Sequence, residues 1–244
     1  AVGDDGSGDW LLDVVRREGI QSDGIATAAG TSGTALIEVD SSGQNRIIVI
    51  PGANDQVDPA AVAAHLKSLK AVDVVLTQGE VPIEVMAAAA DAGKKIGAQV
   101  IVNPAPVRDY PKELLKNVDV LVPNEHEANE ITGLPVGNMV DAVEAAQQLQ
   151  DMGPTCVIIT RGEKGAVWSS PEGSGQTAAF KVTAVDTVAA GDAFCGALAA
   201  GLARGLSMAE ALRWGSAAGA LAATGRGAVP SLPALGAVTD LLER

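Results

Sequence analysis

The stretch VDVVLTQGEVPIEVMAAAADAGKKIGAQVIVN, residues Val72 to Asn103, places a strand, a helix and a second strand in close succession. Its two ends, VDVVLTQ and AQVIVN, are rich in β-branched and apolar residues, which is typical of strands buried on both faces. Between them, PIEVMAAAADAG repeats small apolar residues at helical spacing, and we expect Gly93 to close that helix. This order indicates two parallel strands joined by a crossover helix.

The same alternation continues along the rest of the chain. VDVLVP, TCVIIT and FKVTAV are expected to be further strands. Helices are expected over 9–19, 58–70, 125–132, 139–153, 191–204, 208–223 and 235–242. For the second of these, Asp58 is the expected N-cap and Pro59 the first helical residue. The pattern predicts an α/β fold, with a parallel-dominated sheet covered by helices on both faces, in one domain over residues 1–244.

Two segments depart from this alternation. TALIEVDSSGQNRIIVIPG, residues 34–52, has the period of a β-hairpin with a turn at Ser41 to Gln44, and we interpret it as an appendage of the domain. The opening AVGDDGSGDW is interpreted as a loop that leads into a helix.

In an open parallel sheet, ligands bind beyond the carboxyl ends of the strands. That rule selects the loops QGE, NPAP, PNEHE, RGEKG and DTVAAGD, which all carry polar groups or glycines. The last of these runs into DTVAAGDAF, where Asp192 stands at the start of an apolar helix. The first N–H groups of a helix have no internal partner and carry partial positive charge, so this position suits a phosphate. A plainer interpretation is that Asp192 is an ordinary acidic residue of a first helical turn.

Composition limits the function further. The net charge is -13, which argues against nucleic acid and an anionic membrane surface as partners. Cys156 and Cys195 are expected to be buried thiols in a reducing compartment, and we see no apolar run long enough to span a membrane and no signal peptide, so a cytoplasmic protein is expected. There is no Walker-type GxxxxGK[ST] and no GxGxxG, so a bound phosphate would not be held by either of these two motifs. The missing GxGxxG also disfavours a dinucleotide-dependent oxidoreductase.

DTVAAGDAF resembles the C-terminal signature of the ribokinase-type (PfkB) carbohydrate kinases. The segments GANDQVDP, NPAP, PNEHEA, VIITRGEKGAVW and GRGAVPS also resemble segments of that family, in the same order and at comparable spacing. The resemblance implies a Rossmann-like fold of the ribokinase type with a small β lid, and a kinase that uses ATP, Mg²⁺ and K⁺. NPAP and GAN favour members that phosphorylate D-ribose at O5 over those that act on fructose or adenosine.

The resemblance also implies roles for individual residues. Asp192 matches the catalytic base, which also contacts the sugar, and Ala189, Ala190 and Gly191 match the anion hole. Glu80 matches a sugar contact, and Asn124 and Glu127 match a motif that positions magnesium and phosphate, although NEHEANE could also be a plain acidic first turn. Residues of a loop bordering ATP are matched by Thr160, Arg161, Gly162, Glu163, Lys164 and Gly165, and Ser216 matches a position beside the adenine.

A monovalent-cation site beside the anion hole is matched by Asp186, Val188, Ala222, Gly225, Gly227 and Ser231, mostly through backbone carbonyls. Gly225 could instead be a glycine that ends the preceding helix, and both roles could hold. His126 is interpreted as a surface residue.

The family begins with a strand and a glycine-rich segment that supply sugar contacts and part of the lid. These are not found in the 244 residues, so the domain is expected to be N-terminally incomplete, with 34–52 as the remaining lid hairpin. The full protein is expected to be a homodimer. Alternatives are a kinase for deoxyribose, another sugar or a nucleoside, and a non-catalytic nucleotide-binding fragment.

Overall fold

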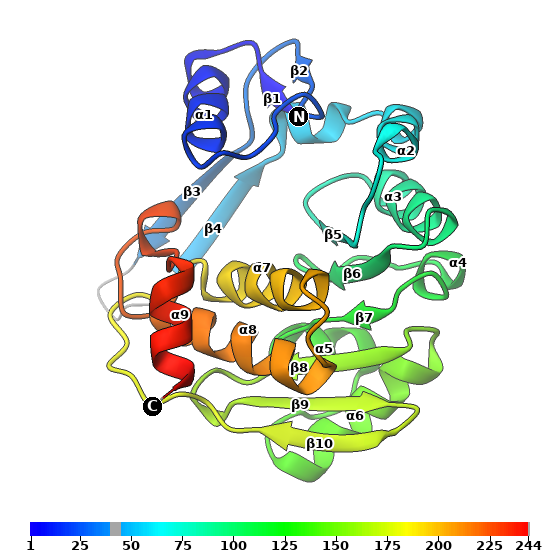
Figure 1. Ribbon diagram of the computed structural model, residues 1–244, viewed down its shortest axis with the longest axis vertical. Helices are drawn as coiled ribbons and strands as arrows, with labels where there is room; N and C mark the ends of the chain where they lie inside the picture. The colour runs from blue at the N-terminus through cyan, green and yellow to red at the C-terminus, as the bar shows by residue number, and fades with distance from the viewer. Residues whose placement is uncertain (40–44, 244) are drawn as a thin grey trace.

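The core of the protein is a six-stranded sheet (Figure 1). The structure is a computed structural model that describes residues 1–39 and 45–243. The strands of this sheet are β5 (Val74–Gln78), β6 (Gln99–Asn103), β7 (Val120–Leu121), β8 (Cys156–Thr160), β9 (Ala166–Ser170) and β10 (Gly173–Thr177). Their order across the sheet is β10-β9-β8-β7-β6-β5, and β5 to β8 run parallel while β9 and β10 are antiparallel additions. The predicted α/β class with a mainly parallel sheet is confirmed.

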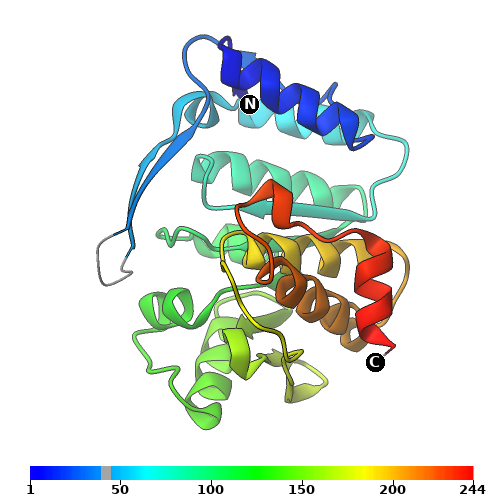
Figure 2. The same ribbon diagram turned by 90° about the vertical axis from the view of Figure 1, so that its left-hand side faces the viewer.

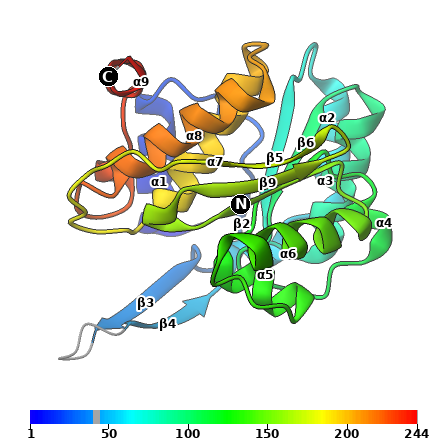
Figure 3. The same ribbon diagram turned by 90° about the horizontal axis from the view of Figure 1, so that it is seen from below.

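Helices cover both faces of the sheet, as Figure 3 shows from below. One face carries α3 (Ile83–Lys95), α4 (Lys112–Leu115), α5 (Glu125–Thr132) and α6 (Met139–Asp151). The opposite face carries α7 (Ala190–Ala203) and α8 (Met208–Ala222), and α9 (Leu235–Leu242) packs on α8. Strand β6 explains the division, because Val100 and Val102 point into the first layer and Ile101 into the second. All three are fully buried, which explains why this strand is a continuous apolar run and does not alternate with polar residues.

The end of α3 differs from the prediction. The helix continues past Gly93 to Lys95 and is followed by Gly97, which has the positive φ of 82° that the expected closing glycine would need. Gly93 instead lies where α3 meets the sheet. A Cβ there would stand 3.0 Å from Cγ2 of Val75 and 3.1 Å from Cγ2 of Val100, so this glycine serves close packing.

FKVTAV is not a strand. The segment between β10 and α7 has no regular structure, and residues 181–185 are exposed. Its last backbone groups turn to the end of α8, where the Val185 N–H donates to the Ala223 carbonyl at 2.8 Å. The edge strand that pairs with β9 is β10, whose sequence GSGQT has no apolar alternation and was not expected.

The amino-terminal part forms a small unit around a two-residue parallel pair, β1 (Val2–Gly3) with β2 (Thr27–Ala28). It also contains α1 (Gly6–Arg17) and η1 (Gly52–Gln56). Helix α2 (Pro59–Ser68) packs on α3 and has the predicted Asp58 N-cap and Pro59 start. The opening residues were expected to be a loop, but Val2 and Gly3 pair as a strand. Helix α1 starts before the expected position because Asp5 caps it.

The hairpin of β3 (Thr34–Val39) and β4 (Asn45–Ile50) extends away from the sheets (Figure 2). The two strands are antiparallel, with Thr34 opposite Ile50, which confirms the predicted pairing. The predicted turn at 41–44 lies outside the described residues. Leu36 and Val49 are 52% and 57% exposed, so apolar side chains of this hairpin face away from the rest of the described chain.

Short 3-10 turns occur at η2 (Gly162–Lys164) and η3 (Val229–Ser231). The described residues include no helix whose length and hydropathy would let it cross a lipid bilayer. Cys156 and Cys195 are free and buried, as predicted, and burial raises their pKa values to about 11 and about 12.

Asp5 should make the amino-terminal unit sensitive to acid. Its Oδ1 accepts from the Gly8 N–H and from the Ser32 hydroxyl, both at 2.8 Å, and its Oδ2 accepts from the Ser32 N–H at 3.0 Å. These bonds hold the pKa of Asp5 below its usual value. A depressed pKa contributes stability that is present above the unfolded-state pKa and is lost as the pH falls below about 4.

We therefore expect Asp5→Asn to lower the melting temperature at pH 7, and the difference from the parent to shrink as the pH approaches 3. Differential scanning calorimetry across this range measures it. Asp9→Asn, an exposed aspartate of the same helix, is the control and should change little. A melting difference that is the same at every pH would show that the Asp5 charge is not responsible.

Candidate active site

Part of the predicted site lies where the carboxyl ends of β5 to β8 meet the start of α7. A cavity of about 190 Å³ lies there. Its lining is Gln78, Glu80, Asn103, Ala105, Val122, Asn124, Glu127, Thr160, Gly191, Asp192, Phe194 and Cys195. Six of the predicted residues line it: Glu80, Asn124, Glu127, Thr160, Gly191 and Asp192. The structure thus joins loops that follow four different strands, as expected for a parallel sheet.

Asp192 lies in the first turn of α7, and its side chain is exposed to this cavity. Its Oδ1 accepts a hydrogen bond of 2.7 Å from Nε2 of Gln78. An ordinary acidic residue of a first turn would face solvent alone. Asp192 instead faces a cavity with polar side chains on its far wall, which favours the functional interpretation.

The start of α7 offers free backbone donors. Among the described residues, the N–H groups of Gly191 and Asp192 have no hydrogen-bond acceptor, whereas the N–H of Ala190 donates to the Thr187 carbonyl at 3.2 Å. Ala189, the residue before the helix, has φ 60° and ψ 7°. That left-handed conformation costs a residue with a Cβ about 1–2 kcal/mol. Such strain persists where it serves a purpose, and here it turns the chain sharply into the helix.

The predicted anion hole is therefore adjusted in detail. Gly191 lines the cavity, but Ala189 and Ala190 do not, and the amide of Ala190 already has a partner. The two amides that remain available at the helix start belong to Gly191 and Asp192. An anion at this point would also benefit from the positive end of the helix dipole. Anion binding here stays a prediction.

Asn124 and Glu127 form a reciprocal cap at the start of α5. The Glu127 N–H donates to Asn124 Oδ1 at 2.9 Å, and the Asn124 N–H and Nδ2 donate to the two Glu127 oxygens at 2.8 and 2.7 Å. Glu127 is only 9% exposed, and burial raises the pKa of its carboxyl. The plain acidic-turn interpretation is therefore correct as far as it goes. Both residues also line the cavity, where amide and carboxylate oxygens suit a hard cation such as Mg²⁺.

Only the first residue of the TRGEKG loop reaches the cavity. Thr160 lines it, while Gly162 and Gly165 shape a tight turn between β8 and β9 with positive φ values of 54° and 85°. Arg161 is buried and tied to Glu125 at 3.1 Å and to the Gly137 carbonyl at 3.1 Å. Lys164 also pairs with Glu125, at 3.2 Å. The side chains of Arg161 and Lys164 therefore fasten this loop to the start of α5.

The residues of the predicted cation site gather at the ends of α7 and α8. Asp186 accepts from the Val188 N–H at 3.0 Å through Oδ1 and from the Gly227 N–H at 2.9 Å through Oδ2. These bonds lower the pKa of Asp186, so it is a stable negative charge between the two loops. Ser231, 9% exposed, lies beside Gly225, where a Cβ would stand 2.9 Å from the serine Cβ.

Two details bear on the cation prediction. Gly225 is not the glycine that ends α8, because the cap is Ala223 and Gly225 has no positive φ. Its role is close packing on Ser231. In the described part of the chain no three His, Cys, Asp or Glu side chains gather as a metal site. A site here would depend on Asp186 and on carbonyl oxygens, a donor set that suits a hard cation.

Three other predicted positions differ in their relation to the cavity. Glu80 lines it on the sheet side. Ser216 lies half-buried in α8, outside the cavity lining, and its hydroxyl donates to the Leu212 carbonyl at 2.9 Å. The side chain of His126 is 85% exposed and lies 3.8 Å from Glu130, which confirms it as a surface residue.

The sequence did not single out Gln78 and Asn103. Both are the last residues of their strands, β5 and β6, and they are paired across the sheet. The loops QGE and NPAP were selected correctly from their position after strands. The side chains that reach the cavity could have been found by the same rule, because the last residue of a parallel strand lies at the ligand-binding edge.

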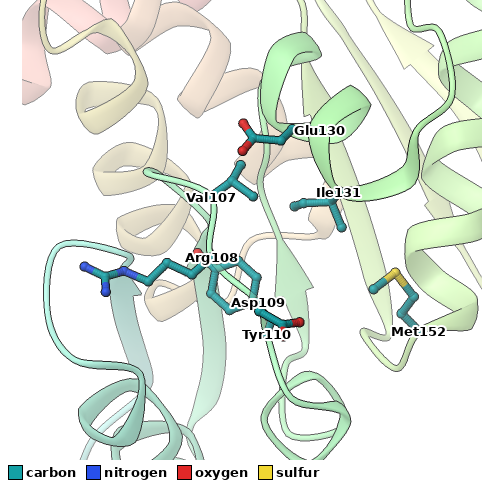
Figure 4. A pocket seen from close by; sticks show the side chains of 7 residues that line it. All are labelled: Val107, Arg108, Asp109, Tyr110, Glu130, Ile131 and Met152. Atoms are coloured by element: carbon teal, nitrogen blue, oxygen red, sulfur yellow. The ribbon is translucent and has the colours of Figure 1, made fainter.

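A larger cavity of about 390 Å³ lies on the α5 side of the sheet (Figure 4). It is lined by Val107, Arg108, Asp109, Tyr110, Glu130, Ile131 and Met152. None of the predicted site residues is among them. Figure 4 shows the Arg108 side chain pointing away from Ile131 and Met152, and its Nε donates to the Gly79 carbonyl at 2.6 Å. The smaller cavity, where strand ends and a helix start meet, is the candidate active site.

The chain is similar to a family of known proteins along most of its length. The chain matches the pfkB family carbohydrate kinase profile over residues 1–235. It is 36% identical over 243 residues to a ribokinase from Haemophilus influenzae, covering 99% of this chain and 79% of that protein. It is 34% identical over 236 residues to a deoxyribokinase from Salmonella typhi, covering 96% of this chain and 77% of that protein.

Among solved structures, Arabidopsis thaliana ribokinase complexed with ribose and ATP is similar with a TM-score of 0.88 and 29% identity, covering 100% of this chain and 80% of that chain. The fold predicted from the strand and helix pattern is the fold of these kinases. The chain therefore belongs to the pfkB family of carbohydrate kinases and is a sugar kinase.

Proposed function

We propose that this sugar kinase transfers the γ-phosphoryl group of ATP to O5 of D-ribose, with ADP as the other product. The observation that carries the proposal is Asp192, which faces a cavity beside the free amides of Gly191 and Asp192. The Haemophilus influenzae relative named ribokinase supports ribose as the acceptor, and the Arabidopsis thaliana structure contains ribose and ATP. The Salmonella typhi deoxyribokinase makes deoxyribose the closest competing acceptor.

The arrangement of the side chains supports the following reaction. The primary hydroxyl of the sugar lies beside Asp192, and its proton moves to a carboxylate oxygen as the sugar oxygen attacks the γ-phosphorus. The bond from phosphorus to the bridging oxygen of ADP breaks on the opposite side. The amides of Gly191 and Asp192 donate to the phosphoryl oxygens as charge develops on them, which is where preorganised donors are most effective. Glu80 orients the sugar from the sheet side.

The remaining polar groups are proposed to contact the nucleotide and the ions. ATP extends past Thr160 and the TRGEKG turn, with Ser216 on the adenine side. Asn124 and Glu127 would hold Mg²⁺ through water, and the ion would neutralise phosphate charge. K⁺ would lie among Asp186 and the carbonyl oxygens of Val188, Ala222, Gly225, Gly227 and Ser231. Because Asp186 binds the loop of Val188, this site is connected to the start of α7.

Assembly and location are part of the same proposal. The exposed apolar side chains of the hairpin, such as Leu36 and Val49, favour a homodimer that covers them. The two free, buried cysteines favour a cytoplasmic location. The competing proposal, a non-catalytic nucleotide-binding module, is disfavoured because a binder does not need a carboxylate beside its phosphate site.

The acceptor is tested by a coupled ADP-release assay of the full-length protein on ribose, deoxyribose, fructose and adenosine. We expect ribose to have the highest kcat/KM. A site that bonds the 2-hydroxyl rejects an analogue lacking it, because its own polar groups are then left unpaired. A higher kcat/KM for deoxyribose than for ribose would show that deoxyribose is the preferred acceptor. Binding of ATP without turnover of any acceptor would favour the non-catalytic module.

Asp192→Asn in the full-length protein should lower kcat by about 10²–10⁴-fold, because the amide cannot accept the hydroxyl proton. The Kd for ATP, measured by isothermal titration calorimetry, should change little because the base acts mainly in the transition state. Asp151→Asn, at the exposed end of α6, is the matched control. If Asp192→Asn keeps most of its kcat, Asp192 is not the base.

Asp186→Ala should weaken the activation of the enzyme by K⁺. The variant loses a negative charge and both bonds that join the loops of Val188 and Gly227. The measurement is kcat against K⁺ concentration, with tetramethylammonium replacing K⁺ at constant ionic strength. Equal activity of the parent in the two cations would contradict a working cation site.

A further inference from the structure

The hydrogen bond between Gln78 and Asp192 joins two elements that are 114 positions apart in the sequence. Gln78 is the last residue of β5, and Asp192 is in the first turn of α7. Within the described residues, Gln78 is the one side chain that donates to the Asp192 carboxylate. The bond is 2.7 Å long and ends on Oδ1, and no donor in residues 1–39 or 45–243 reaches Oδ2. The two carboxylate oxygens of Asp192 therefore differ, because Oδ1 is hydrogen-bonded within the protein and Oδ2 is available to a ligand.

The backbone after Gln78 is held on both sides. The Gly79 N–H donates to the Ala105 carbonyl at 3.0 Å, and the Gly79 carbonyl accepts from Nε of Arg108 at 2.6 Å. A Cβ on Gly79 would stand 2.4 Å from the Pro106 carbonyl oxygen, so the backbone at Gly79 also packs closely against the loop of Pro106. Gln78 itself is fixed in the sheet opposite Asn103. The amide that touches Asp192 thus projects from a rigid support.

We propose that Gln78 is a positioning residue, which holds Oδ1 of Asp192 and so presents Oδ2 to the hydroxyl of the substrate. This inference rests on the proposed role of Asp192 as the base. An exposed aspartate in a first helical turn can adopt several rotamers, and proton transfer needs the accepting oxygen within hydrogen-bond distance of the hydroxyl. The amide of Gln78 selects one rotamer before the substrate arrives. An amide also donates without carrying charge, so it leaves Asp192 as the charged group at this point.

Two variants of the full-length enzyme separate positioning from simple stabilisation. Gln78→Ala removes the donor, and we expect kcat to fall about 10- to 100-fold, since misplacement of a catalytic group by about 1 Å can cost this much. The KM for ATP and the melting temperature should stay close to those of the parent. Gln78→Glu keeps the shape but sets a second carboxylate against Asp192. Two carboxylates at this distance disfavour the ionised pair, so the acidic limb of the kcat profile should move to higher pH by about 1 unit or more.

The matched controls are Gln148→Ala and Gln148→Glu. Gln148 is exposed on α6, and its Nε2 donates to the Thr132 carbonyl at 3.3 Å. These variants make the same chemical changes away from the site and should leave kcat and the pH profile unchanged. The double variant Gln78→Ala with Asp192→Asn should be no slower than Asp192→Asn alone, because a positioning residue has no effect once its base is gone.

The outcomes separate this inference from the proposed function. If Asp192→Asn is slow while Gln78→Ala keeps the parent kcat, the positioning role is wrong and the base remains. If Gln78→Ala lowers only the melting temperature, or if its effect multiplies with that of Asp192→Asn, Gln78 is not a positioning residue. Should no sugar be turned over, a crystal structure of Gln78→Ala still decides. A changed Asp192 rotamer supports the inference, and an unchanged one overturns it.

Discussion

The structure depends on one constraint, which is that both faces of a short parallel sheet must be buried. Strand β6 shows how strict this is, since Val100, Ile101 and Val102 are all fully buried and alternate between two helical layers. Because β5 to β8 are parallel, their carboxyl ends all lie at one edge of the sheet. Each connection between them must cross back over a face of the sheet. Helix α7, which covers the second face, brings its amino end to the same edge. The cavity is a consequence of this packing.

The proposed function requires a protein of net charge -13 to bind polyphosphate. Its lining contains no lysine or arginine. Arg161 and Lys164 belong to the loop that the family resemblance matches to ATP, and both pair with Glu125. In the proposed site, the partial positive charge that favours phosphate comes from the start of α7, and the proposed Mg²⁺ and K⁺ would add to it. The net charge of the whole protein therefore does not decide whether an anion binds at this cavity, because the free amides of Gly191 and Asp192 act locally.

Much of this could be predicted from the sequence, because the informative signals were local. Apolar runs identified β5 to β8, and the position of loops after strands identified most of the cavity. The errors had nonlocal causes. FKVTAV has a strand-like composition, but its backbone bonds to the end of α8. Gly93 looked like a helix end and is a contact point with Val75. The contact between Gln78 and Asp192 spans 114 positions, and no local pattern encodes it.

In the proposed reaction, the transferred phosphoryl group and the acceptor hydroxyl meet between the α7 amides and Asp192. The most direct measurement is a crystal structure of the full-length protein with ribose and a non-hydrolysable ATP analogue. We expect γ-phosphate oxygens at about 3 Å from the Gly191 and Asp192 nitrogens, and the primary hydroxyl of ribose at hydrogen-bond distance from Asp192 Oδ2. A sugar whose primary hydroxyl lies away from Asp192, or a nucleotide seated in the cavity of Val107 and Met152, would contradict it.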